Sequence, residues 1–99
     1  MDISSAIKLI DVFFSAFYHE QDDVRGTTRA LAAIKATPEY RQDLARAFRL
    51  LLEGSLDPGL LTNLVREAAN RNVQNDEEAS AYLEFIFNDT LLNYELDDE

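Results

Sequence analysis

A long apolar stretch, residues 3–20, constrains the fold of this chain more than any other feature. Its apolar side chains recur at steps of three and four residues, which is the helical period, and leave only a narrow polar strip. The polar strip consists of Lys8, Asp11 and Ser15. A helix that is apolar around most of its circumference is typical of the centre of a bundle, and this one is too short and too charged to span a bilayer. We therefore expect a central N-terminal helix that other helices wrap.

Proline, glycine and capping residues divide the rest of the chain. Thr37 precedes Pro38, and a proline suits the first turn of a helix, so a helix is expected from residue 38 to residue 53, ending at Gly54 in the left-handed conformation. Gly26 predicts a break before a short helix at about 29–36. Asp57-Pro58 predicts a start for a helix at about 58–70. The serines near residue 4 are expected to cap the first helix.

The last quarter of the chain predicts one more helix, at about 76–92. Asn75 is placed to cap it, with Glu78 three residues further on, and residues 71–75 read as a loop. Nothing in the chain alternates with the period of a strand. The sequence therefore predicts an all-α class: a compact single-domain bundle of about five helices, with an acidic tail at 93–99 that we expect to be frayed.

Composition restricts the classes of function. The 99 residues are the size of one domain, and the absence of cysteine excludes disulfides, thiol nucleophiles and cysteine-ligated metals. No basic stretch precedes the apolar run, so we expect no secretory signal and a cytoplasmic location. The net charge of -10 argues against binding nucleic acid or an anionic membrane. Nine of the 19 acids lie within 76–99, which contains no Lys or Arg, so this segment accounts for almost the whole charge excess.

The end of the first helix carries an aromatic run, FSAFYHEQDD, at residues 14–23. It resembles the signature near the N-terminus of the contact-dependent growth inhibition (CDI) immunity proteins, a helical family of similar length. Phe14 and residues 16–19 match well, whereas residues 20–23 match loosely because the tryptophan of the family's His-Gln-Asp-Trp-like stretch is missing. The later order of helices is also similar. The resemblance implies a protein that binds the C-terminal toxin domain delivered by a neighbouring cell and blocks it.

His19 is the only histidine, and acids follow it directly. One histidine beside acids in a turn does not define a metal geometry, and a general base also needs a partner and a pocket. We expect a structural role for His19, no metal or cofactor, and no enzymatic activity, because phosphate-binding and nucleophile motifs are missing too. The arginines near residue 46 are balanced by neighbouring acids, which favours a solvated helix face over a nucleic-acid surface.

The last helix offers the best candidate interface. Phe85 lies off the apolar arc, with acids on the same side, and a large ring framed by charge is typical of an interface anchor. The other interpretation is that a neighbouring helix covers Phe85. We predict contacts with the toxin from the acids and the ring of this helix, and secondarily from two acids of the first loop. The candidates are Glu77, Glu78, Glu84, Phe85 and Asp89, followed by Asp22 and Asp23.

The sequence thus favours an immunity protein that neutralises a toxin, expected to be a nuclease, through a tight complex. A nuclease presents positive charge to phosphates, and an acidic surface would steer the encounter. Two alternatives stay open: a small acidic helical adaptor or regulator, and an inhibitor that mimics nucleic acid through its acids alone. The oligomeric state has no signal in the sequence.

Overall fold

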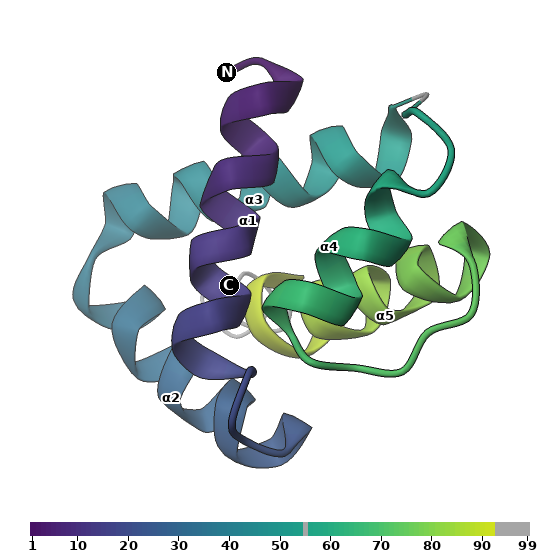
Figure 1. The fold of residues 1–99 in the computed structure, drawn as a ribbon. Helices are drawn as coiled ribbons and strands as arrows, with labels where there is room; N and C mark the ends of the chain where they lie inside the picture. Colours follow the sequence, from purple (N-terminus) through teal and green to yellow (C-terminus); the bar gives the residue numbers. More distant parts are fainter. Residues whose placement is uncertain (55, 93–99) are drawn as a thin grey trace.

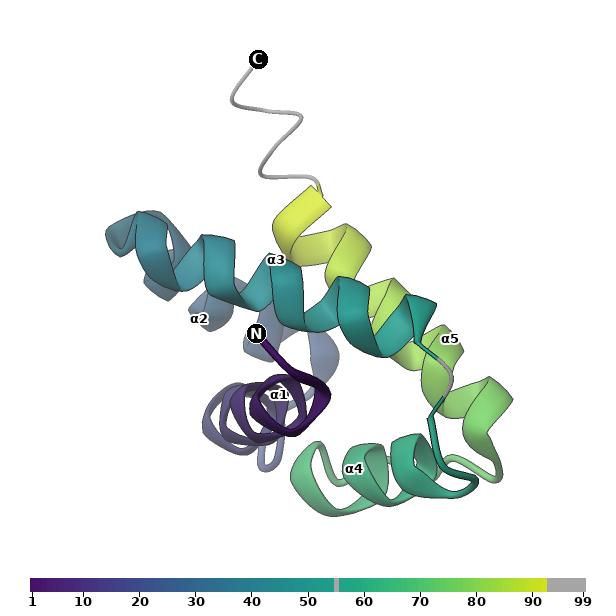
Figure 2. The same cartoon turned by 90° about the horizontal axis from the view of Figure 1, so that it is seen from above.

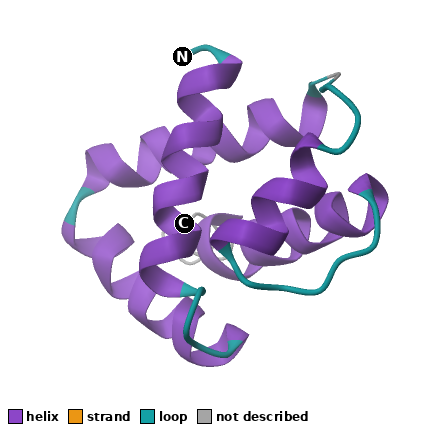
Figure 3. Cartoon of the chain, viewed as in Figure 1, coloured by secondary structure: helices purple, strands orange, loops and turns teal. Residues whose placement is uncertain are grey.

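The computed structural model describes residues 1–54 and 56–92, and these residues form helices joined by short connections (Figures 1 and 3). The elements in chain order are α1 (Ile3–Phe17), α2 (Asp23–Ala36), α3 (Pro38–Glu53), α4 (Leu60–Ala68), α5 (Asp76–Phe87) and the π-helix η1 (Asn88–Leu92). No strand occurs within the described ranges. The all-α bundle of five helices predicted from the sequence is confirmed, and α3 has the predicted bounds. The predicted acidic tail, 93–99, lies outside the described residues.

The helices form two layers that pack against each other, and the layers are best seen along the axis of α1 (Figure 2). On one side α1 and α4 lie next to each other, and on the other α3 crosses α1 and packs against α5. The α2 helix contacts α1, α3 and η1, so it closes one end of the bundle. A helix from the first half of the chain, α2, therefore lies against η1, at the end of the described residues.

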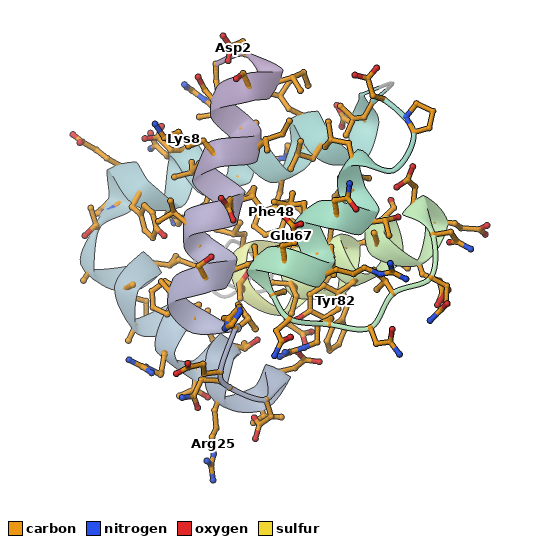
Figure 4. The ribbon with its side chains drawn as sticks, in the orientation of Figure 1. Asp2, Lys8, Arg25, Phe48, Glu67 and Tyr82 are labelled. Carbon is orange, nitrogen blue, oxygen red and sulfur yellow. The ribbon has the colours of Figure 1, made fainter. Side chains whose placement is uncertain are left out.

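Aromatic side chains of α1 occupy the centre of the core. Phe13, Phe14 and Tyr18 are fully buried, and so is Phe48 of α3, which lies in the middle of the molecule in Figure 4. The ring of Phe14 meets those of Tyr18 and Phe48 edge-on, with centroids 5.8 and 6.2 Å apart, a geometry that aromatic pairs favour. The predicted polar strip of α1 is exposed, but Val12 is exposed as well, so the neighbouring helices cover α1 on one side and do not wrap it completely.

The first connection differs from the prediction. The α2 helix begins at Asp23, well before the expected start, because the Asp22 carboxylate accepts a hydrogen bond from the backbone N–H of Arg25, at 2.8 Å, and caps the helix. Gly26 is therefore a buried helical residue and not a break. Its missing side chain leaves room for the Tyr18 ring, since a Cβ there would lie 2.5 Å from Tyr18 Cδ1.

Two predicted caps differ from the structure, although the helices concerned begin or end where expected. Asp2, and not a serine, caps α1, because its carboxylate reaches the backbone N–H of Ser5 at 2.8 Å. Gly54 ends α3 with φ -80° and ψ 154°, which is extended backbone and not the left-handed conformation. Its N–H still bonds to the Leu50 carbonyl, so the helix ends without needing a positive φ.

The α4 helix starts later than predicted and has an unusual cap. Asp57-Pro58 lies outside it, and Gly59 takes the capping position with φ 86°, which glycine adopts readily. The Asp76 carboxylate, from the first turn of α5, accepts hydrogen bonds from the backbone N–H groups of Gly59 (2.7 Å) and Thr62 (3.0 Å). One acid thus ties the start of α4 to the start of α5.

The start of α5 agrees with the prediction, and helical structure continues to Leu92 as predicted, but its last part is a π-helix and not an α-helix. The Asn75 side chain accepts from the backbone N–H of Glu78 at 2.9 Å, as expected of the cap. After Phe87 the helix widens into the π-helical turn η1, where the Thr90 hydroxyl donates to the Ile86 carbonyl at 2.7 Å. Periodicity alone does not distinguish this turn from a continuing α-helix, and π-turns inside helices often lie near functional sites.

Candidate protein-binding groove

An open groove of about 240 Å³ lies between the first two turns of α2 and the junction of α5 with η1. We call it the α2–α5 groove. It is lined by Asp23, Val24, Thr27, Thr28, Phe85 and Asp89. Three of the seven predicted contact residues, Asp23, Phe85 and Asp89, are therefore brought together, although more than 60 positions separate Asp23 from the other two.

The apolar part of the α2–α5 groove is exposed. Phe85 is 47% exposed and Val24 is 77% exposed, which are high values for large apolar side chains. Within residues 1–54 and 56–92, no helix covers Phe85. Of the two interpretations left open by the sequence, the described residues therefore agree with the exposed ring. The Tyr82 ring lies beside it, with centroids 6.5 Å apart, and supports it from the same helix. Exposed rings near charge are common anchors of protein interfaces.

The hydroxyls of the groove are already engaged, while its acids keep free acceptors. Thr27 shares a hydrogen bond with the Tyr18 hydroxyl at 2.8 Å, and Thr28 donates to the Val24 carbonyl at 2.9 Å. Asp89 makes no hydrogen bond or ion pair with any described residue. Among the described residues, no basic side chain lines the groove. The α2–α5 groove is therefore an apolar surface that carries the unpaired charge of Asp89, whereas the charge of Asp23 is paired with Arg71 behind the groove.

Asp23 is held in place by a network behind the groove. Its Oδ1 accepts from Arg71 Nε at 3.0 Å, from Arg71 Nη2 at 2.8 Å and from the Tyr82 hydroxyl at 2.8 Å. The guanidinium also lies 5.8 Å from the centre of the Tyr82 ring. Asp23 Oδ2 has no hydrogen-bond partner among the described residues. The carboxylate is thus fixed through one oxygen and keeps the other available.

Arg71 reaches this position through a reversal of the chain after α4. Asn70 has φ 56°, and asparagine is one of the few residues besides glycine that tolerate this left-handed conformation. The turn directs Arg71 back into the molecule, where its guanidinium also donates to the carbonyls of Tyr18 (3.1 Å), Ala69 (2.8 Å) and Gln21 (2.7 Å). The loop predicted at 71–75 is present, but sequence reasoning missed this function of Arg71. The available signal was a lone basic residue in an otherwise uncharged loop.

The network also changes the ionisation of two tyrosines. Burial, as the largest cause, and the nearby Asp23 charge together raise the pKa of Tyr18 to about 12, against the lowering effect of the Thr27 hydrogen bond. Burial, and then the hydrogen bond to Asp23, raise the pKa of Tyr82 above its ordinary value. Both phenols therefore stay protonated at neutral pH, and Tyr82 remains a donor to Asp23.

The other predicted contact residues lie elsewhere. Asp22 adjoins the groove, but its carboxylate caps α2 and lies 3.8 Å from Arg25, which extends away from the molecule in Figure 4. Glu84 lines a different groove, between α5 and α3, together with Arg49. Glu77 and Glu78 are exposed in the first turn of α5, at the end opposite Phe85.

His19 is exposed in the turn after α1, and its backbone carbonyl accepts from Asn70 Nδ2 at 3.3 Å. Among residues 1–54 and 56–92, no three His, Cys, Asp or Glu side chains come together as a metal site would require. In the same ranges, every helix is too short or too polar to cross a lipid bilayer.

Comparison with known proteins finds no matching family model, no matching curated protein and no matching solved structure. The resemblance to CDI immunity proteins therefore rests on residues 14–23 and the order of helices. In the structure this segment covers the end of α1 and the capped start of α2.

Proposed function

We propose that this chain is an immunity protein that binds the toxin domain of a CDI system, expected to be a nuclease, and neutralises it by forming a tight complex in the cytoplasm. The observation that carries the proposal is the α2–α5 groove, where the exposed Phe85 and Val24 lie beside Asp23 and Asp89. Inhibition of this kind needs no catalysis and no cofactor from the binding protein. It requires a surface that covers the substrate site of the toxin or a region next to it.

The distribution of charge supports a basic partner. A nuclease concentrates positive charge where it holds phosphates, and a protein with a net charge of -10 is attracted to it before contact. Charge sets the rate and selectivity of such an encounter, whereas a few desolvated anchors supply most of the affinity. Phe85 is the best candidate anchor, because it is the only exposed aromatic side chain that the described residues place in this groove.

The two alternative functions predict different behaviour. An inhibitor that mimics nucleic acid would bind through its acids alone, so removing the Phe85 ring would change little. An adaptor or regulator would have no toxin encoded beside it. The exposed apolar pair in the groove favours the immunity function over nucleic-acid mimicry.

Co-purification is the first test. The immunity gene is expected to follow a large toxin gene directly, so the C-terminal domain encoded upstream is produced together with the tagged chain. We expect the two proteins to elute as one complex and the domain to lose its activity in that complex. Separate elution at micromolar concentrations, with both proteins folded, would contradict the proposal.

Surface plasmon resonance over a salt series then locates the interface. Asp89→Lys and Glu84→Lys change the net charge equally from the same helical segment, but only Asp89 lines the α2–α5 groove. Both variants should slow association at low salt, because steering depends on the overall field and is screened within about 8 Å at physiological ionic strength. Only Asp89→Lys should also speed dissociation. Phe85→Ala should weaken binding by roughly 2 kcal/mol or more through dissociation.

Folding of each variant is checked first by circular dichroism. If Asp89→Lys and Glu84→Lys behave identically at every salt concentration, the α2–α5 groove is not the contact surface. Binding would then be sought at Glu77 and Glu78, or on the α3 side of α5.

A further inference from the structure

We infer that the α2–α5 groove receives a single arginine side chain of the partner protein, with its guanidinium between Asp23 and Asp89 and its stem against Phe85 and Val24. This inference rests on the proposed function, because it specifies the chemistry of the partner at the same groove.

The size of the groove favours a side chain over a free small molecule. Its volume of about 240 Å³ lies below the range of roughly 300–1,000 Å³ that is typical of small-molecule pockets. The groove is also open and lies on two helices, so a protruding residue of another protein can approach it without a conformational change.

The lining favours a ligand that is both apolar and cationic. Val24 and the Phe85 ring offer surface for an aliphatic stem. The two threonine hydroxyls already make hydrogen bonds within the protein, so the strongest acceptors left for a ligand are the Asp89 carboxylate and Oδ2 of Asp23. A neutral polar ligand would leave Asp89 unpaired, whereas a cation would neutralise Asp89 and could also donate to Oδ2 of Asp23, whose Oδ1 is already paired with Arg71.

The arrangement favours arginine over lysine. A guanidinium carries five N–H donors in a planar fork and can serve two carboxylates at once, and it also stacks on an aromatic ring. A lysine ammonium is a compact, strongly hydrated charge that gains less from the exposed face of Phe85.

Arg71 and Tyr82 act as positioning residues for this groove. They hold Asp23 through Oδ1 and leave Oδ2 without an internal partner. Because Asp23 is fixed before the partner arrives, less side-chain entropy is lost when the complex forms. Arg71 thus orients Asp23, the carboxylate that would bind the arginine of the partner protein.

The test uses the intact chain and three small probes that differ in the head group: Nα-acetyl-arginine methylamide, the corresponding lysine compound and the neutral citrulline compound. Each is titrated at millimolar concentrations while backbone amide signals are followed by NMR. We expect saturable shifts for the arginine probe at Thr27, Thr28, Phe85 and Asp89. The lysine probe should bind roughly an order of magnitude more weakly, and the citrulline probe should produce no saturable shift.

Variants establish where the probe binds. Asp89→Asn and Phe85→Leu should remove the saturable shifts, and the matched control Glu84→Gln, from the other groove of α5, should keep them. The NMR spectrum of each variant reports its folding directly. Equal binding of lysine and arginine, shifts scattered over all exposed acids, or unchanged binding in Asp89→Asn would each overturn the inference.

These outcomes are separable from those of the proposed function. If the toxin domain binds but the arginine probe does not enter the groove, the inference fails and the proposed function stands. If the probe enters the groove but the domain encoded upstream does not bind, the groove takes arginine from another partner and the proposed function fails.

Discussion

Gly26 has a structural role that its residue type does not reveal. It lies in the second turn of α2, where alanine normally stabilises a helix by about 1 kcal/mol relative to glycine. Here a Cβ would lie 2.5 and 2.7 Å from two ring carbons of Tyr18 and 2.8 Å from the Phe17 carbonyl oxygen. The ring cannot move freely, because Tyr18 is fully buried and its hydroxyl is bonded to Thr27.

Gly26→Ala should therefore destabilise the protein, against the usual helix propensity. We expect a net loss of about 1–2 kcal/mol, in which overpacking outweighs the gain in propensity. Urea unfolding measures it, with Arg29→Ala on the exposed side of α2 as a control that should change little. An increase in stability for Gly26→Ala would mean that the Tyr18 ring can shift.

Phe14 and Val12 provide a matched pair on α1. Phe14 is fully buried, whereas Val12 is 56% exposed. Phe14→Ala should cost on the order of 3–5 kcal/mol, because the cavity among the neighbouring rings cannot collapse completely. Val12→Ala should cost less than about 0.5 kcal/mol. Comparable losses in parallel urea melts would show that α1 is not the core helix described here.

At the scale of the elements, Asp76 joins the starts of two helices and makes that junction sensitive to pH. The hydrogen bond from the Gly59 backbone N–H, followed by those from Thr62, lowers the pKa of Asp76 below its ordinary 3.8. A lowered pKa in the folded state means that the charged form stabilises the fold above pH 3.8. That contribution is lost as the pH falls through the lower folded value.

Asp76→Asn should accordingly be less stable than the parent at pH 7, and the difference should shrink as the pH is lowered from about 4 towards 2. Thermal melts over this range measure the difference. Glu77→Gln removes an exposed carboxylate from the adjacent position and controls for the change in net charge. A difference that is constant between pH 7 and pH 2 would show that the carboxylate charge does not hold the junction.

The helices themselves were predictable, but several of their ends were not. Helical period and the Thr37-Pro38 pair define α3 completely, because both signals are local. The start of α4 depends on Asp76, which is 17 positions away from Gly59, and no local pattern contains that information. The early start of α2 was missed because Gly26 was interpreted by its intrinsic flexibility, whereas its actual role is set by the Tyr18 ring.

At the scale of the whole molecule, Arg71 connects the loop after α4 to the start of α2. Arg71→Lys keeps the charge but cannot reproduce the planar fork, and we expect a loss of about 1–2 kcal/mol. We place this loss of stability at the lower end of the range for hydrogen bonds to charged groups, because the Asp23 side chain is 37% exposed and water screens the interaction. Tyr82→Phe should cost about 1 kcal/mol.

A double-mutant cycle in urea tests whether these residues act together. Arg71 and Tyr82 donate to the same oxygen of Asp23, so the combined variant should lose less than the sum of the single losses. Strict additivity would mean that the two contacts are independent.

The candidate site was predictable only in part. The acids of the last helix and the position of Phe85 off its apolar arc predicted Phe85 and Asp89 as contact residues, and the acids of the first loop predicted Asp23. The two groups were treated as separate surfaces, whereas the structure places them in one groove. Only the packing of α2 against η1 brings them together. Val24 and the threonines of the groove were missed, because a break was predicted at Gly26 and the helix was expected to begin only at about residue 29. In the structure α2 begins at Asp23 and contains all three residues.

The contacts of Arg71 also bear on how long the folded state lasts. They join positions 48 to 53 residues apart, and closing such loops costs chain entropy before any contact is gained. We therefore expect these bonds to form after the rate-limiting step of folding, so that Arg71→Lys speeds unfolding and leaves the refolding rate nearly unchanged in stopped-flow experiments. A slower refolding rate would place the contacts in the folding nucleus instead. If refolding is unchanged, the contacts of one loop arginine slow unfolding and so lengthen the lifetime of the folded state.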